Sequence, residues 1–167
     1  MVGSKKNEKV LDVACGNGVL TFKISERGSQ VHGVDLSEDA IKSAINFARH
    51  KDLNCEFKVG DAHDLPYPDE YFDKIVCSSS LEHFTDDIKA LKEMHRVLKS
   101  NGRVFLTTDS FNYPISKELK EKHKKLAHVV NYYSKKELKK ALENAGFKMK
   151  RSKYLLNSPL TSFFFIN

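Results

Sequence analysis

Cysteine is scarce in this sequence. Its three cysteines, Cys15, Cys55 and Cys77, stand far apart without a CxxC spacing, and its seven histidines are scattered without an HExxH motif. Because a zinc site needs clustered Cys and His ligands, we expect no metal. An odd, sparse set of cysteines without an export signal indicates reduced thiols in a cytoplasmic protein.

Segments that would enter a membrane are also missing. The sequence contains no apolar run of about 18 residues, the length that a transmembrane helix requires. Residues 1–9 are polar and lack the apolar stretch of a signal peptide. We therefore expect neither a membrane span nor an export signal.

The residues that are present suffice for a packed core. The chain has 167 residues, is 40% hydrophobic and contains eleven Phe and six Tyr, which argues against disorder. Its length suits one domain of about 100–200 residues. We expect a single domain over residues 1–167, with a short N-terminal leader and a basic insertion at about residues 110–133.

Positive charge is concentrated late in the chain. The net charge is +6, but residues 115–153 hold thirteen Lys or Arg and four Glu, a net of +9, and the rest holds fifteen basic and eighteen acidic residues, a net of −3. Lysines 117–125 could attract an anionic substrate or surface, and those from Lys135 on are expected on a helix exterior. A nucleic-acid partner for residues 115–153 is disfavoured, because no RNA-binding motif accompanies them and a lysine-rich helix is usually a solvated face.

Predicted strands alternate with predicted helices along the chain. Apolar or alternating segments predict strands at residues 9–14, 30–35, 55–59, 72–77, 103–108, 147–156 and 160–166. Helical spacing and caps predict helices at residues 19–27, after Ser37, at 86–99, in part of 115–130, and after Ser134 through 145. This alternation indicates an α/β fold built on a parallel sheet with right-handed crossovers.

A glycine-rich turn follows the first predicted strand and opens the first predicted helix. In this turn, Gly16 and Gly18 allow a ligand to approach the backbone closely. Asp35 ends the next strand, 19 residues after Gly16, where a carboxylate can accept both hydroxyls of an adenosine ribose. A GxG alone could be an ordinary tight turn, but strand, turn, helix, strand and terminal Asp together indicate a nucleoside site.

Ligands that contain pyrophosphate are disfavoured at this turn. The dinucleotide motif GxGxxG needs a third glycine for close packing of helix on strand, and Thr21 stands there. A P-loop would need GxxxxGK followed by Ser or Thr, and the sequence contains none.

The turn resembles motif I of the class I S-adenosylmethionine-dependent methyltransferases, an acidic residue followed by GxGxG. Further segments resemble other parts of this family, in the family's order, namely residues 33–37, 60–73, 80–84, 93–99 and 133–147. The sequence is most similar to the methyltransferase-11 group, which contains the ubiquinone and menaquinone biosynthesis methyltransferases.

The resemblance implies a fold and an activity. The fold would be a single Rossmann-like, doubly wound, mostly parallel sheet of seven strands in the order 3-2-1-4-5-7-6, with an antiparallel final strand. The activity would be in-line methyl transfer from S-adenosylmethionine to an unidentified small-molecule acceptor. Such chemistry asks mainly for alignment and exclusion of water, so a missing catalytic motif is uninformative.

The resemblance also implies roles for individual residues. Asp12 would orient the turn and help to hold the ammonium end of the cofactor. The remaining cofactor contacts would come from residues at the carboxyl ends of the strands: Ala14, Cys15, Gly16 and Gly18 at the methionine part, Asp35 at the ribose, Leu36 and Asp61 at the adenine, the Ala62 N–H beside it, and Ser78 and Ser79 beneath the methionine.

Candidates near the reacting methyl are fewer. His83 matches a position where it could orient the acceptor or accept its proton, although a capping or packing role competes with catalysis. Asp109 and Tyr113, after the fifth strand, are weaker candidates. An Asx turn is the alternative role for Asp61.

Two departures from the family pattern bear on activity. Ala14 stands where the family usually has the first Gly of GxGxG, so its Cβ is strained if the position needs a positive φ. The first predicted strand already begins at residue 9, and relatives carry helices before it that cover the cofactor. The chain could lack this cover, could be trimmed, or could borrow cover from a partner subunit or a second copy.

Two other functions therefore remain open. One is a non-catalytic, methyltransferase-like module that binds cofactor or a partner protein. The other, less favoured, is an RNA-directed methyltransferase.

Overall fold

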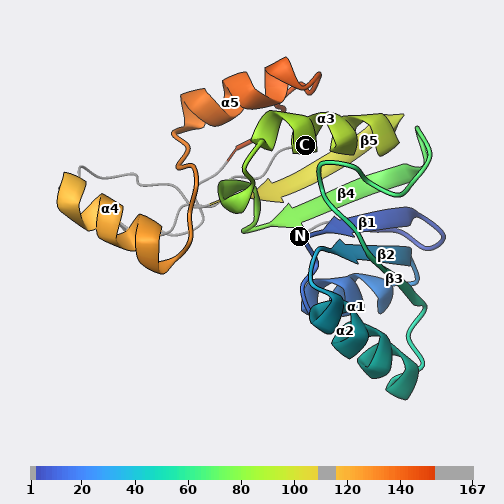
Figure 1. The fold of residues 1–167 in the computed structure, drawn as a ribbon. Coiled ribbons are helices and arrows are strands. Elements are labelled where there is room, and N and C mark those ends of the chain that lie inside the picture. The colour runs from blue at the N-terminus through green and yellow to red at the C-terminus, as the bar shows by residue number, and fades with distance from the viewer. Residues whose placement is uncertain (1–2, 109–115, 153–167) are drawn as a thin grey trace.

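Five parallel strands form the sheet of the computed structural model, which describes residues 3–108 and 116–152. The strands lie in the order β3-β2-β1-β4-β5 (Figure 1). Their bounds are β1 Lys9–Val13, β2 Gln30–Asp35, β3 Cys55–Val59, β4 Phe72–Ser78 and β5 Leu98–Thr107. The prediction of an α/β fold on a parallel sheet is confirmed, including the order of the first five strands.

Helices lie between most successive strands and cover both faces of the sheet, although β3 and β4 are joined by a loop without a helix. They are α1 Val19–Ser25, α2 Glu38–His50, the 3-10 helix η1 Leu81–His83, α3 Asp87–Val97, α4 Lys117–Leu126 and α5 Lys135–Asn144. Side chains alternate along β1, so Val10 packs in one cluster with Ile24 of α1, whereas Leu11 packs in another with Leu91 of α3 and Leu142 of α5. The sheet is therefore buried on both faces, as parallel sheets require.

Local capping signals place the helix starts. The Ser37 side chain accepts a hydrogen bond from the Ala40 N–H at 3.2 Å, and Asp86 Oδ1 accepts one from the Lys89 N–H at 2.9 Å. Ser134 and Glu137 form a capping box at α5. These short-range bonds satisfy helix N–H groups that have no partner within the helix.

The boundary between α3 and β5 differs from the sequence-based prediction. We expected a helix over residues 86–99 and a strand from residue 103, but α3 ends at Val97 and β5 begins at Leu98. Leu98 pairs with Phe72 of β4, and regular pairing resumes at Lys74 and Arg103 after an irregularity. The partner strand, which helical spacing cannot reveal, converts Leu98 from a helix residue to a strand residue.

The two closing strands of the predicted seven are not part of the described sheet. Residues 147–152, expected to begin the sixth strand, belong to no strand. A strand requires a hydrogen-bonded neighbour, and the neighbour expected for this segment, residues 160–166, lies outside the described residues. The order 3-2-1-4-5-7-6 is thus supported over its first five positions, and the rest stays a prediction.

Candidate functional site

The glycine turn lies at the carboxyl end of β1. From β1 the chain continues to β2 and β3 on one side of the sheet, and later to β4 and β5 on the other side. β1 pairs with β2 on one side and with β4 on the other. In open α/β sheets, ligands bind at such a switch point, outside the carboxyl ends of the strands. The Cys15 N–H donates to the Val34 carbonyl at 3.0 Å, which fastens the turn to β2.

Three residues of the turn have a left-handed backbone. The φ angles of Ala14, Gly16 and Gly18 are 56°, 53° and 83°. A Cβ at Gly18 would lie 2.9 Å from Cζ of Phe22, whereas a Cβ at Gly16 would meet no atom within 4 Å. The positive φ and this contact together favour glycine at position 18, and at Gly16 the backbone is open to approach.

Asp35 holds the turn and the start of α2 together. Its Oδ2 accepts the Gly16 N–H at 2.8 Å, and its Oδ1 accepts the Ser37 N–H at 2.9 Å. Because each carboxylate oxygen has two lone pairs, both can accept one more hydrogen bond. The sequence indicated a ribose ligand at Asp35 but not this structural role.

Asp12 lies beneath the turn, with only 2% of its surface exposed. The Thr21 hydroxyl donates to Asp12 Oδ2 at 2.7 Å, and this bond joins β1 to α1. Burial raises the pKa of Asp12 to about 7, and the nearby charge of Asp35 adds to the rise. Burial also raises the pKa of the neighbouring Cys15 thiol, so Cys15 is a packing thiol and no nucleophile at neutral pH.

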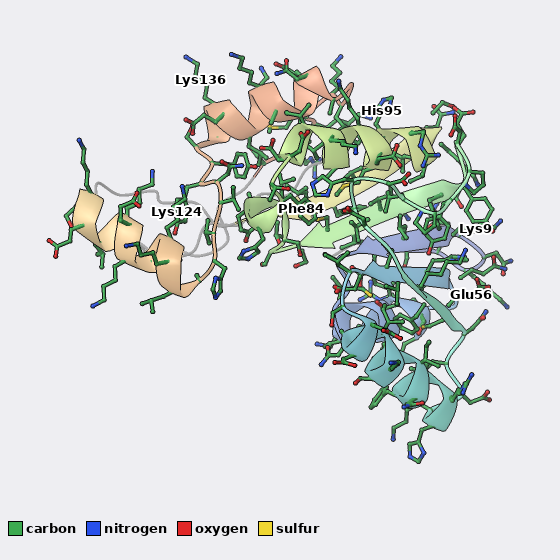
Figure 2. All side chains as sticks on the ribbon, in the orientation of Figure 1. Lys9, Glu56, Phe84, His95, Lys124 and Lys136 are labelled. Atoms are coloured by element: carbon green, nitrogen blue, oxygen red, sulfur yellow. The ribbon has the colours of Figure 1, made fainter. Side chains whose placement is uncertain are left out.

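A cavity of about 290 Å³ brings many of the predicted residues together. The predicted residues in its wall are Ala14, Asp35, Leu36, Asp61, Ala62 and His83. Its other wall residues are Val34, Gly60, His63, Phe84 and Thr85. Figure 2 shows Phe84 beside η1, at the end of the sheet opposite Lys9, where β1 begins. The cavity therefore opens at the carboxyl ends of the strands.

Asp61 and His63 form a local pair at this cavity. Asp61 Oδ1 accepts the His63 N–H at 2.9 Å and lies 2.6 Å from Nδ1 of the His63 ring. These hydrogen bonds lower the pKa of Asp61. The first bond is the Asx turn considered above, yet it uses one oxygen only, and the structure records no partner for Oδ2 among the described residues.

The end of β4 is joined to the end of β5. The hydroxyls of Ser78 and Thr107 lie 3.0 Å apart, and the Ser79 N–H donates to the Thr107 carbonyl at 2.9 Å. Ser79 has a φ of 51°. Ser78 and Ser79 are exposed at this edge but do not line the cavity, so the structure brings them to the same end of the sheet without placing them in one wall with Asp35.

His83 is the last residue of η1 and is exposed. Its Nδ1 lies 3.0 Å from the carbonyl oxygen of His128, on the segment between α4 and α5. His83 thus combines a structural hydrogen bond with a position in the cavity wall.

Sequence reasoning missed several residues at the site. Only the contacts in the structure identified four of them, namely Thr21, His63, Phe84 and Thr107. The Asp-x-His spacing of Asp61 and His63 was the one local signal that could have revealed a member of this set. The weaker candidates Asp109 and Tyr113 lie outside the described residues.

Within residues 3–108 and 116–152, no three His, Cys, Asp or Glu side chains gather closely enough to hold a metal ion. No helix of this part of the chain is both long and apolar enough to cross a bilayer.

Three features define a Rossmann-like, nucleoside-binding class of protein. They are a parallel sheet with the order 3-2-1-4-5, a glycine turn after β1 and a carboxylate at the end of β2. The family model described as "Methyltransferase domain" matches residues 4–146. The chain therefore belongs to the methyltransferase-domain family, which uses S-adenosylmethionine.

A curated relative supports this family assignment. The chain is 38% identical over 122 residues to the ubiquinone/menaquinone biosynthesis C-methyltransferase UbiE of Pectobacterium carotovorum, a match that covers 70% of this chain and 48% of the relative. The chain thus spans about half the length of this curated relative.

Solved structures with a similar fold support the same family assignment. The YcgJ protein from Bacillus subtilis has a TM-score of 0.79 and 29% identity, over 90% of this chain and 66% of YcgJ. Phosphoethanolamine N-methyltransferase 2 of Haemonchus contortus, in complex with S-adenosyl-L-methionine, has a TM-score of 0.78 and 25% identity, over 90% of this chain and 36% of that protein.

Proposed function

We propose that this chain binds S-adenosylmethionine at the carboxyl ends of β1 and β2 and transfers its methyl group to a small-molecule acceptor. One observation carries the proposal: a single cavity joins the glycine turn, the Asp35 carboxylate and the Asp61 loop. In this proposal the chain forms one methyltransferase-like domain, whose sheet is completed by the two strands expected after Gly146.

The residues present suit the parts of this cofactor. The free lone pairs of Asp35 suit the ribose hydroxyls, Asp61 Oδ2 suits the exocyclic amine of adenine, and Leu36, which is 74% exposed, offers an apolar surface for the ring. The Ala62 N–H lies beside Asp61. The open backbone at Gly16 suits the methionine part, for which Asp12, Ala14, Cys15, Gly18, Ser78 and Ser79 are the further proposed contacts.

The cofactor would supply a methyl group on a sulfonium, which is a good leaving group. The chain would align the acceptor with this methyl and exclude water. Where the attacking atom carries a hydrogen, His83 would accept that proton. The names of the relatives, which refer to quinone biosynthesis and to phosphoethanolamine, support a small-molecule acceptor without identifying it.

Calorimetry with S-adenosylhomocysteine tests cofactor binding. We expect Asp35→Ala to weaken binding at least about tenfold, because hydrogen bonds to a charged group contribute about 1.5–3 kcal/mol. Asp39→Ala is the matched control, since Asp39 is an exposed carboxylate in the first turn of α2. Thermal unfolding of each variant shows whether the fold is retained.

Two results would contradict the proposal. One is the absence of S-adenosylhomocysteine binding to the intact protein. The other is an equal loss of affinity in the Asp35 and Asp39 variants, which would show that the Asp35 carboxylate has no special role.

A second candidate function is a non-catalytic module that binds cofactor or a partner protein. The left-handed backbone of Ala14 favours it, because a Cβ in this conformation is strained at the place where the family has glycine. The exposure of Leu36, Ser78 and Ser79 also favours cover by a partner subunit or a second copy. Incubation with methyl-labelled S-adenosylmethionine and heat-inactivated cell extract separates the two, since label that appears only when this protein is added excludes a non-catalytic module.

A further inference from the structure

The segment between α4 and α5 contacts the 3-10 helix that carries His83. The ring Nδ1 of His83 lies 3.0 Å from the carbonyl oxygen of His128. A carbonyl can only accept, so the hydrogen of this bond belongs to Nδ1. In the neutral ring, Nε2 is then the nitrogen that can accept a proton.

The backbone at His128 is strained. Its φ is 52°, in the left-handed region that residues other than glycine rarely adopt. Such strain persists only where the surrounding structure enforces it, and it is frequent at functional sites. Here the strained residue is the one whose carbonyl meets His83.

Two hydrogen bonds hold this segment against the residue before His83. The N–H groups of Val130 and Asn131 both donate to the Glu82 carbonyl oxygen, at 2.7 Å and 3.0 Å. Together with the bond from His83, they fasten residues 128–131 to η1 over adjacent positions.

The Glu82 side chain extends this connection to the sheet. Glu82 has no exposed surface, and its Oε2 accepts the hydroxyl of Thr108 at 2.9 Å. Thr108 directly follows β5 and is also fully buried. A buried carboxylate is costly unless it is hydrogen-bonded, so Glu82 and Thr108 fix η1 relative to the end of β5.

We propose that Glu82 and His128 are positioning residues for His83. Glu82 fixes η1 between β5 and residues 128–131, and the His128 carbonyl then holds the His83 ring in the Nδ1–H tautomer, with Nε2 as the base. The inference rests on the proposed function in that His83 is to take the acceptor's proton. In that step the attacking oxygen or nitrogen of the acceptor bonds to the methyl carbon, the carbon–sulfur bond breaks with its electrons going to sulfur, and the acceptor's proton passes to Nε2.

The tautomer can be measured directly. Protein labelled with ¹⁵N in its histidines is studied by NMR at alkaline pH, where the imidazole is neutral, and the two ring nitrogens then report which one carries the hydrogen. We expect at least about a fivefold excess of the Nδ1–H form at His83, as one hydrogen bond can produce. An excess of the Nε2–H form in the unmodified protein would overturn the proposal.

Paired variants of Thr108 test the role of Glu82. Thr108→Val removes the hydroxyl donor and should reduce the excess at His83 to less than about twofold, whereas Thr108→Ser keeps the hydroxyl and the excess. Ser29→Ala is the control: it deletes another buried hydroxyl, which donates to the Lys5 carbonyl at 3.0 Å near the start of β2, and should leave His83 unchanged.

An unchanged tautomer in Thr108→Val would contradict the positioning role. If that variant does not fold, Glu82→Gln replaces it. A neutral amide accepts a hydrogen bond more weakly than a carboxylate, so we expect a tautomer ratio between those of the unmodified protein and an unbiased ring. An unchanged ratio would again contradict the positioning role. The readout needs no cofactor. Loss of S-adenosylhomocysteine binding would therefore disprove the proposed function without altering this result.

Discussion

Ala14 combines a side chain with a backbone conformation that usually belongs to glycine. Its φ of 56° places it in the left-handed region, which costs an L-residue about 1–2 kcal/mol. The hydrogen bonds from Cys15 to Val34 and from Gly16 to Asp35 hold the next two residues of the turn in place. Tertiary contacts thus impose the geometry of a glycine turn on an alanine.

Ala14→Gly should therefore stabilise the protein. We expect the free energy of unfolding to rise by about 0.5–1 kcal/mol, because relief of the strain exceeds the entropy that glycine adds to the unfolded chain. Urea unfolding measures the change. Ala44→Gly, within α2, is the control and should lose about 1 kcal/mol or more. A loss of stability in Ala14→Gly would show that the alanine methyl is needed for packing.

Asp12 should make stability depend on pH. The folded protein keeps the Asp12 proton up to about pH 7, whereas the unfolded chain releases it near the ordinary value of 3.8. Between these values the folded state binds more protons than the unfolded state, so this group lowers the free energy of unfolding as the pH rises.

Asp12→Asn removes this dependence and keeps an oxygen for the Thr21 hydroxyl. Between pH 4 and pH 7, the stability of the variant should gain at least about 1 kcal/mol relative to the unmodified protein. Denaturant unfolding at a series of pH values gives the difference. Parallel curves for the two proteins would mean that Asp12 titrates normally.

At the scale of elements, α4 and α5 differ although both are rich in lysine. α5 buries Leu138 and Leu142 completely and packs along α3, whereas α4 has no buried residue and stands away from the sheet (Figure 1). Lys124 and Lys136 mark the two helices in Figure 2. Lysine content alone did not separate a packed helix from a solvated one.

Matched leucine variants should reveal this difference. Leu138→Ala should lower the free energy of unfolding by about 2–5 kcal/mol, because it leaves a cavity in the core. Leu119→Ala, on α4, should change it by less than about 0.5 kcal/mol, since Leu119 is 48% exposed. Urea unfolding of both variants is the measurement. Equal losses would indicate that α4 packs against the rest of the protein in solution.

At the scale of the whole molecule, charge is divided between the sheet and the late helices. The cavity is walled by the acidic Asp35 and Asp61, whereas residues 115–153 carry a net charge of +9, thirteen basic minus four acidic residues. Much of this charge lies on the surfaces of α4 and α5. The overall net charge of +6 therefore describes neither part of the protein.

The sequence by itself determined the succession of strands and helices, the helix caps and the residues of the glycine turn. These depend on neighbours within a few positions, as the Ser37 and Ser134 caps illustrate. The fold class could be predicted too, because the alternation of strands and helices is itself a local pattern, and the glycine turn and Asp35 each follow from one strand end.

Only the tertiary structure decided those features that depend on contacts between residues far apart in the sequence. It made Leu98 a strand residue through Phe72, gave Ala14 a left-handed backbone, and joined His83 to His128 across 45 positions of sequence. Local periodicity does not encode such contacts, because they arise when strand ends and loops from separate parts of the chain meet at one edge of the sheet. The surroundings of each candidate site residue were decided there.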